Sequence, residues 1–176
     1  MGKKSILILT ACLFVFCFAK VRPTAKEKIN WLSVAEVNQK LKTEPKPVLI
    51  DLFTNWCYWC KVMDKKTYNR SEVITYINEH FYAIKLNAET KEIIEWSNKN
   101  YGYNAQNKIN DFALYVTNGQ LSFPTTVIFP EAQKGPAAIP GFMEAKEMEP
   151  ILKYFGEGKY KTQNFNEFSK TFKETW

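Results

Sequence analysis

Two cysteines, Cys57 and Cys60, follow directly after the largely apolar run of residues 48–53. Thiols at this spacing fit three uses: a static disulfide, half of a metal site, or a redox pair that opens and closes. If the run is a strand and a helix begins at the cysteines, unpaired backbone N–H groups and the positive end of the helix dipole face the first sulfur. That placement favours a thiolate at Cys57, which is the species that attacks disulfides.

The chain begins with a pattern typical of a secretory signal peptide, expected over residues 1–19. Lys3 and Lys4 precede an apolar run that ends at small residues suited to cleavage near Ala19. The run is short for a membrane-spanning helix. Two alternatives remain open: retention as a membrane anchor, and lipid attachment at Cys12 within a lipobox-like sequence. Export predicts a periplasmic or other extracytoplasmic location, where disulfides persist.

Removal of the signal peptide takes Cys12 and Cys17 away and leaves Cys57, Cys60 and His80 as the remaining thiol and imidazole groups. A closed zinc site usually needs four Cys or His ligands, so no metal site is predicted. A copper carrier that uses His80 as an accessory ligand is a weaker alternative. A static staple is disfavoured, because so small a ring constrains little of the unfolded chain. Redox exchange is therefore the preferred chemistry.

The composition fits one soluble globular domain: the chain has 176 residues, of which 45% are apolar and 24% charged. The formal charge of +6 is spread along the chain without a long basic block, so nucleic acid is not an expected partner.

The order of strand and helix patterns predicts an α/β fold with a central sheet covered on both faces. Strands are expected at residues 48–53, 81–86, 125–129 and 137–139, the last paired antiparallel with the third. Helices are expected at residues 31–41, 61–65, 72–79, 89–100, 104–116 and 146–155. Ser33 and Ser71 are expected as N-caps, and Pro150 is expected near the first turn of the last helix or at a kink in it.

Two segments flank this domain, which is predicted over residues 31–156. Residues 20–30 have the polar composition of a linker. In residues 157–176, four aromatic side chains recur at helical spacing: Phe165, Phe168, Phe172 and Trp176. That pattern predicts an extra amphipathic helix folded back onto the domain. Docking onto a partner or a membrane is the alternative.

The chain from about residue 30 to residue 156 resembles the thioredoxin superfamily, and in particular its exported bacterial thioredoxin-related proteins. The resemblance rests on landmarks in the family's order: Asp51, the Trp-Cys-x-x-Cys-Lys motif of residues 56–61, Lys85, the loop Phe123-Pro124-Thr125, and Gly141. The sequence departs from plain thioredoxin in the dipeptide Tyr58-Trp59, in a helical insertion before the proline loop, and in the tail.

The resemblance implies a thioredoxin fold in which Cys57 is the nucleophile, exposed at the helix start, and Cys60 is the resolving thiol. It implies that Asp51 is a buried carboxylate with a raised pKa that exchanges a proton with Cys60, tuned by Lys85. It also implies a cis bond before Pro124. The implied substrate surface consists of Trp56, Tyr58, Trp59, Phe123, Pro124 and Gly141.

The resulting hypothesis is an exported thiol–disulfide oxidoreductase that needs no cofactor beyond its own cysteine pair. Reduction of protein disulfides is the preferred direction, because the Asp51 and Lys85 pair resembles thioredoxin and no histidine lies between the cysteines. The expected partners are disulfide-containing or dithiol client proteins and an exported or membrane thiol donor of electrons. The alternative is a thioredoxin-fold binding module that holds a client, with redox activity incidental.

Overall fold

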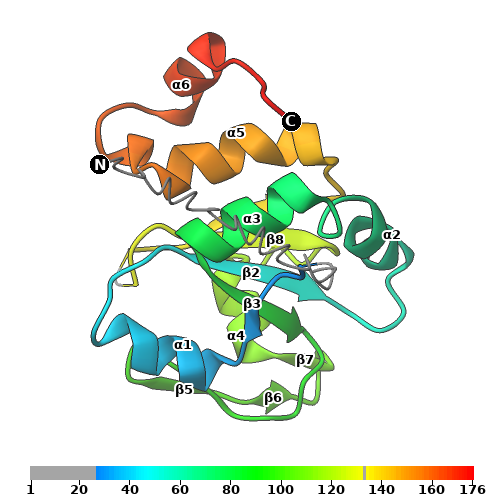
Figure 1. Cartoon of the computed structure of the whole chain (residues 1–176). Helices are drawn as coiled ribbons and strands as arrows, with labels where there is room; N and C mark the ends of the chain where they lie inside the picture. The colour runs from blue at the N-terminus through cyan, green and yellow to red at the C-terminus, as the bar shows by residue number, and fades with distance from the viewer. Residues whose placement is uncertain (1–26, 133) are drawn as a thin grey trace, which may run out of the picture.

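The computed structural model describes residues 27–132 and 134–176, and the expected signal peptide, with Cys12 and Cys17, lies outside them. Its centre is a five-stranded sheet in the order β1-β3-β2-β8-β9 (Figure 1). The strands are β1 (Trp31–Leu32), β2 (Val48–Phe53), β3 (Tyr82–Asn87), β8 (Thr125–Phe129) and β9 (Ala137–Pro140). The first three are parallel to one another, whereas β8 runs antiparallel to both β2 and β9. This mixed sheet confirms the four expected strand segments and the expected pairing of the last two, whereas the helix expected from residue 31 is wrong at its start, because Trp31–Leu32 pairs with β3 as β1.

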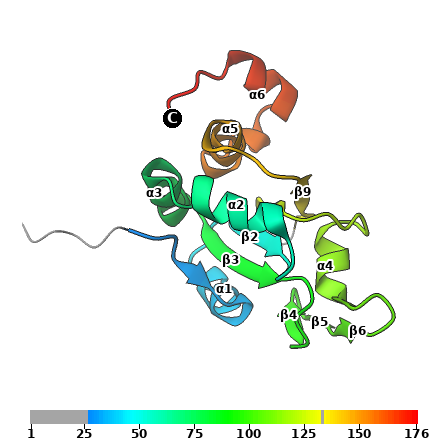
Figure 2. The same cartoon turned by 90° about the vertical axis from the view of Figure 1, so that its right-hand side faces the viewer.

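Helices cover both faces of the sheet, which gives the molecule two apolar cores (Figures 1 and 2). On one face lie α1 (Val34–Leu41) and α4 (Asp111–Val116), and on the other lie α2 (Tyr58–Lys66), α3 (Ser71–His80) and α5 (Ala145–Gly156). Side chains of β2 alternate between the two: Ile50 and Leu52 pack in the first core and Leu49 in the second. By the same alternation, Asp51 is on the face that α2 covers.

Helix starts follow the sequence at α1 but not at α3. Ser33 caps α1 as expected, in a capping box with Glu36. The expected cap at Ser71 is wrong: Arg70 occupies the N-cap position of α3 without a side-chain bond, and the Ser71 hydroxyl donates to Glu72 instead. The cap of α2 is Cys57, whose sulfur accepts the backbone N–H of Cys60 at 3.0 Å.

The helix expected at residues 89–100 is wrong. This segment forms a hairpin of β4 (Ile94–Trp96) and β5 (Lys99–Tyr101), with positive φ at Ser97 and Asn98 in the turn. The physical reason is tertiary: Trp96 is 1% exposed and its ring lies 4.8 Å from that of Phe129 in the sheet. Helical periodicity in a short segment cannot compete with the burial of so large a side chain.

The helical insertion expected at residues 104–116 is half right. It begins as a second hairpin of β6 (Tyr103–Asn104) and β7 (Ile109–Asn110), and only α4 is helical. The helix starts late because the Asn110 side chain caps it, accepting the N–H of Phe112 at 2.9 Å. Asn118 and Gly119 take positive φ after α4, whose end at Val116 confirms the expected end of this segment.

Trp96→Ala is expected to lower the free energy of unfolding by about 3–5 kcal/mol, because it empties a fully buried site between the hairpin and the sheet. Urea unfolding followed by circular dichroism measures this. Ile93→Ala is the matched control, because Ile93 directly precedes β4 and is 73% exposed. Its effect is expected to stay within about 0.5 kcal/mol. Equal effects of the two substitutions would show that the β4–β5 hairpin is not part of the cooperative core.

The chain after α5 forms a 3-10 turn, η1 (Lys159–Lys161), and a short helix, α6 (Phe165–Thr171), which lies over α5 on the side away from the sheet (Figures 1 and 2). The single helix expected over residues 157–176 is therefore wrong in extent. Phe172 adopts an extended conformation, and buried Glu149 of α5 accepts the backbone N–H groups of Thr175 and Trp176. The helix ends early because the chain after it bonds to Glu149. This residue belongs to α5, so the sequence pattern of residues 157–176 does not reveal the contact.

Glu149→Ala is expected to free this segment and to destabilise the protein by about 1–3 kcal/mol, because the backbone N–H groups of Thr175 and Trp176 lose an ionised acceptor. Hydrogen exchange at the amides of Thr175 and Trp176 is expected to accelerate. The control is Glu174→Ala, an exposed carboxylate on the same segment. Unchanged amide protection in Glu149→Ala would contradict the assigned contact.

Two smaller corrections concern the edges of the domain. Residues 27–30 were expected in a polar linker, but Ile29 is buried and the Asn78 side chain bonds the backbone on either side of it, at Lys28 and Asn30. Pro150 lies inside α5, beyond its first turn, because the helix already starts at Ala145. Within the described ranges, no helix combines the length and apolarity that crossing a membrane requires.

Candidate functional site

Cys57 and Cys60 form a disulfide at the start of α2. The buried strand β2 and the loop after it deliver Cys57 to the N-cap position, while Cys60 lies in the first turn of the helix. Both residues are only 4% exposed, so the expectation that Cys57 is exposed is wrong for this oxidised state. The two sulfurs differ instead in position: Cys57 Sγ accepts the Cys60 N–H and faces the helix N-terminus, whose partial positive charge stabilises an anion.

Three aromatic side chains surround the disulfide and are highly exposed: Trp56 at 67%, Tyr58 at 70% and Trp59 at 54%. The ring of Trp56 stands edge-on to that of Phe123 at 5.8 Å, and its Nε1 donates to Glu89 at 3.0 Å. The indole is therefore fixed between two neighbouring loops. Exposed aromatic rings held in place are typical of surfaces that bind protein.

A groove of about 270 Å³ lies beside these rings. Its lining consists of Trp59, Phe123, Pro124, Gly141 and Phe142. The bond before Pro124 is cis, and the Pro124 carbonyl accepts the N–H of Gly141 at 2.8 Å, which joins the proline loop to the end of β9. Four residues expected at the substrate surface thus line one groove, although they come from three separate parts of the chain.

Asp51 and Lys85 lie side by side because β2 and β3 pair in a register that makes them direct neighbours. Lys85 Nζ donates to Asp51 at 2.5 Å and also to Asp64 of α2 at 2.5 Å. The ammonium group lies 5.0–5.9 Å from the rings of Phe53, Trp31 and Tyr68. One lysine therefore joins a buried carboxylate to a partly exposed one within an aromatic enclosure.

Burial raises the pKa of Asp51 from 3.8 to about 6, although the charge and hydrogen bond of Lys85 pull it down. Burial would lower the pKa of Lys85, but the two carboxylates outweigh it and raise that pKa. Asp51 is thus able to gain and lose a proton near neutral pH while Lys85 stays charged. That property suits a group that exchanges protons with a thiol.

Sequence reasoning missed Asp64, Glu89 and Phe142. Asp64 follows Cys60 by four positions, so helical spacing places the two on the same side of α2. This spacing could have identified Asp64 as a candidate site residue. Glu89 follows β3 in a loop and Phe142 follows Gly141, and no pattern marks either. A larger cavity, about 1000 Å³, lies elsewhere, between α1 and the loop that leads into β4.

No group of three or more metal-ligating side chains occurs among residues 27–132 and 134–176. His80, considered above as an accessory copper ligand, lies at the end of α3, where its ring stacks 4.1 Å from that of Tyr76. The structure therefore brings His80 into a packing contact with α3's own tyrosine.

The fold and this site define a member of the thioredoxin superfamily that carries a Cys-x-x-Cys disulfide. The chain belongs to the family described as Thioredox_DsbH, "Protein of unknown function, DUF255", whose model matches residues 19–166. Its fold is similar to that of a thioredoxin-fold protein from Helicobacter pylori, with a TM-score of 0.55 and 23% identity over 71% of this chain and 78% of that one. A structure titled "DsbH Oxidoreductase" is similar with a TM-score of 0.54 and 19% identity, over 80% of this chain and 92% of that one.

Among curated proteins, the "Disulfide bond reductase DsbH" of Chlamydia pneumoniae is 29% identical over 97 residues, which cover 53% of this chain and 58% of that protein. This chain spans a smaller share still of other curated relatives: 10% of an uncharacterized Caenorhabditis elegans protein, and 19% of the "Thiol:disulfide interchange protein DsbD" of Pectobacterium atrosepticum.

Proposed function

We propose that this protein is a thiol–disulfide oxidoreductase that reduces disulfides in other proteins. The observation that carries the proposal is the Cys57–Cys60 disulfide at the N-terminus of α2, beside a groove that contains the cis Pro124. A disulfide at a helix start breaks to give a stabilised thiolate. The name of the Chlamydia pneumoniae relative, a disulfide bond reductase, supports the same chemistry.

The proposed cycle begins with both cysteines reduced. The Cys57 thiolate attacks a client disulfide, forms a mixed disulfide with one client sulfur and expels the other as a thiolate, which takes up a proton. The Cys60 thiolate then attacks Cys57 Sγ, which re-forms the Cys57–Cys60 disulfide and releases the second client thiol. Two electrons and two protons pass from protein to client, and a dithiol donor must supply them for the next cycle. Asp51 is proposed to accept the proton of Cys60.

The client surface is proposed to consist of Trp56, Tyr58 and Trp59 together with the groove at Phe123, Pro124 and Gly141. An extended client segment is expected to pair its backbone with the Phe123 backbone like an added strand, and to place one side chain in the groove.

The direction of exchange is tested by the reduction potential of the Cys57–Cys60 pair, measured by equilibration with defined thiol–disulfide buffers. A reductase is expected near thioredoxin, about −270 mV, whereas a strong oxidant lies near about −120 mV. Alkylation of the reduced protein at neutral pH is expected to modify Cys57 faster than free cysteine. A potential at the oxidising end would reverse the direction, and equal alkylation rates would remove the proposed nucleophile.

Export of the protein is part of the proposal and rests on the pattern of residues 1–19. Mass spectrometry of the protein recovered from cells tests it. A chain that starts near residue 20 supports cleavage, added lipid on Cys12 supports a lipoprotein, and an intact membrane-bound chain supports an anchor. An intact chain in the cytosol contradicts export.

A further inference from the structure

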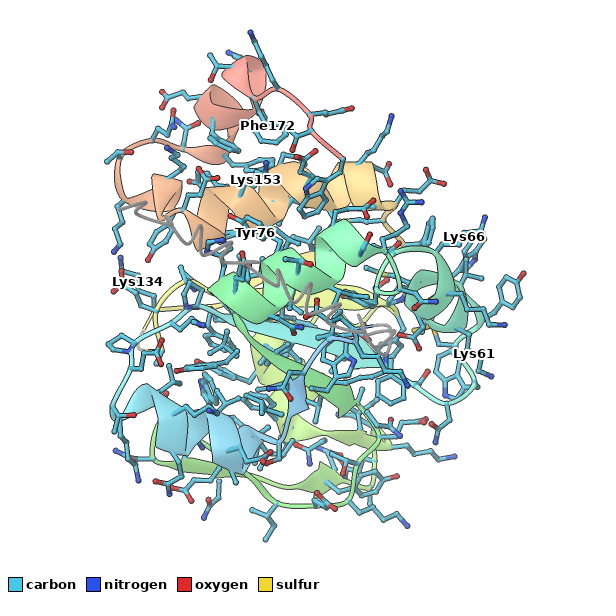
Figure 3. All side chains as sticks on the ribbon, viewed as in Figure 1. Lys61, Lys66, Tyr76, Lys134, Lys153 and Phe172 are labelled. Carbon is cyan, nitrogen blue, oxygen red and sulfur yellow. A yellow bond between two sulfur atoms is a disulfide. The ribbon has the colours of Figure 1, made fainter. Side chains whose placement is uncertain are left out.

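Three lysines of α2, which we call the α2 lysine patch, point into solvent: Lys61, Lys65 and Lys66. Figure 3 shows Lys61 and Lys66 projecting outward at the α2 end of the molecule. None of the three forms an ion pair with any residue of the described chain. Their charges are therefore available to a partner.

Helical spacing places this patch on the same side of α2 as the exposed aromatic residues of the motif. Lys61 and Lys65 follow Tyr58 by three and seven positions, and Lys66 follows Trp59 by seven. Lys66 lies about 9 Å along the helix axis from Cys60. This is slightly more than the Debye length of about 8 Å at physiological salt, so the attraction of Lys66 for a molecule at the disulfide is partly screened there and is stronger at low salt.

Two carboxylates of the site bind groups other than the patch. Asp64 lies on α2 but is paired with Lys85, and Glu89 accepts the Trp56 indole N–H. The helix dipole accounts for Lys65 and Lys66, which lie in the last turn, but it disfavours a cation near the first turn, where Lys61 lies. Helix stability by itself therefore does not explain the patch.

Basic residues beside exposed aromatic rings also suit an anionic membrane surface. The groove argues for a protein. It is a small apolar concavity next to Trp59, formed by α2, the proline loop and the end of β9, and it is suited to one side chain of an extended segment. A bilayer lying on these rings would cover the disulfide and keep a client sulfur from it.

We propose that the client segment carries acidic side chains beside its reacting disulfide, and that these face Lys61, Lys65 and Lys66 when the segment occupies the groove. This inference rests on the proposed function and adds the class of client. Rim charges of this kind act mainly on the association rate and its salt dependence.

The test uses the full chain with Cys12→Ser and Cys17→Ser in every sample, so that only Cys57 and Cys60 react. Three cystine peptides serve as probes, identical except for Glu, Gln or Lys on both sides of the disulfide. The reduced protein is mixed with each peptide at low and at physiological salt, and second-order rate constants are divided by those of a neutral small dithiol. The division removes the peptides' own differences in reactivity.

The Glu peptide is expected to react about tenfold or more faster than the Lys peptide at low salt, and the ratio is expected to shrink as salt is added. The variant K61E/K65E/K66E is expected to invert this ratio. The matched control, K99E/K170E/K173E, changes the net charge equally at exposed lysines of β5 and the tail, and is expected to keep the ratio.

Equal rates for the three peptides would overturn the inference and leave the proposed function standing. An equal change of the ratio in both triple variants would also overturn it, because net charge alone would then be the cause. Binding to phosphatidylserine vesicles that depends on the patch, without any preference among the peptides, would assign the patch to a membrane instead. Failure to reduce even the Gln peptide would overturn both proposals.

Discussion

Cys57→Ser is expected to abolish disulfide reduction, lowering the rate by a factor on the order of 10³ or more, because the attacking sulfur is gone. Cys60→Ser is expected to keep the first step and to accumulate a mixed disulfide between Cys57 and the client, because no second thiol releases it. Both are measured with Cys12 and Cys17 replaced by serine. Non-reducing electrophoresis detects the adduct, and added dithiol is expected to reduce the mixed disulfide and release the client.

The two cysteines are equally buried in the oxidised protein, so exposure does not assign their roles. The assignment rests on position, since Cys57 caps the helix and Cys60 lies inside its first turn. An adduct that forms in Cys57→Ser but not in Cys60→Ser would exchange the two roles. If a deletion strain is complemented fully by Cys57→Ser, the chemistry is dispensable and the protein acts as a binding module.

Asp51→Asn is expected to stabilise the protein at pH 8 by about 3 kcal/mol while slowing exchange. The rise in the pKa of Asp51 from 3.8 to about 6 means that ionising this carboxyl costs about 3 kcal/mol more in the folded state than in the unfolded state. Asparagine approximates the protonated acid and avoids that cost, and Lys85 keeps Asp64 as an anionic partner. Loss of the proton acceptor for Cys60 is expected to slow resolution by about a hundredfold.

The shifted pKa of Asp51 also determines whether the stability of the protein rises or falls with pH. Between pH 3.8 and about 6 the folded state binds more protons at Asp51 than the unfolded state does, so stability falls as pH rises through this window. Lys85 has a raised pKa, so its contribution is lost only above the ordinary lysine range and stays constant here. Asp51→Asn is expected to lack the fall between pH 4 and 7.

Urea unfolding of the oxidised protein and the variant at pH 4 and pH 8 measures this difference. The control is Asp111→Asn, which alters the first turn of α4. Equal stability of Asp51→Asn and the parent at pH 8 would mean that burial does not penalise the ionised carboxylate. Unchanged exchange kinetics would remove Asp51 from the proposed proton transfer.

Segments that depend on neighbours in the chain were predictable from the amino-acid sequence alone. The strand β2 follows from a largely apolar run and β8 from the run after Pro124. The cysteines were expected at the start of the next helix, which begins at Tyr58 rather than at the expected residue 61. The site's Asp51, Lys85 and Gly141 came from the resemblance to a family. These features are local, or fixed in order along the chain, so one sequence is enough to find them.

Contacts between residues far apart in the chain were found only from the three-dimensional structure. Trp96 turned an apparent helix into a hairpin because its ring is buried against Phe129. The register of β2 against β3, together with the packing of α2 on the same face, brought Asp64 to Lys85. Such contacts depend on burial and strand register across the sheet, and the free energy of burying a side chain exceeds the local preference of a short segment.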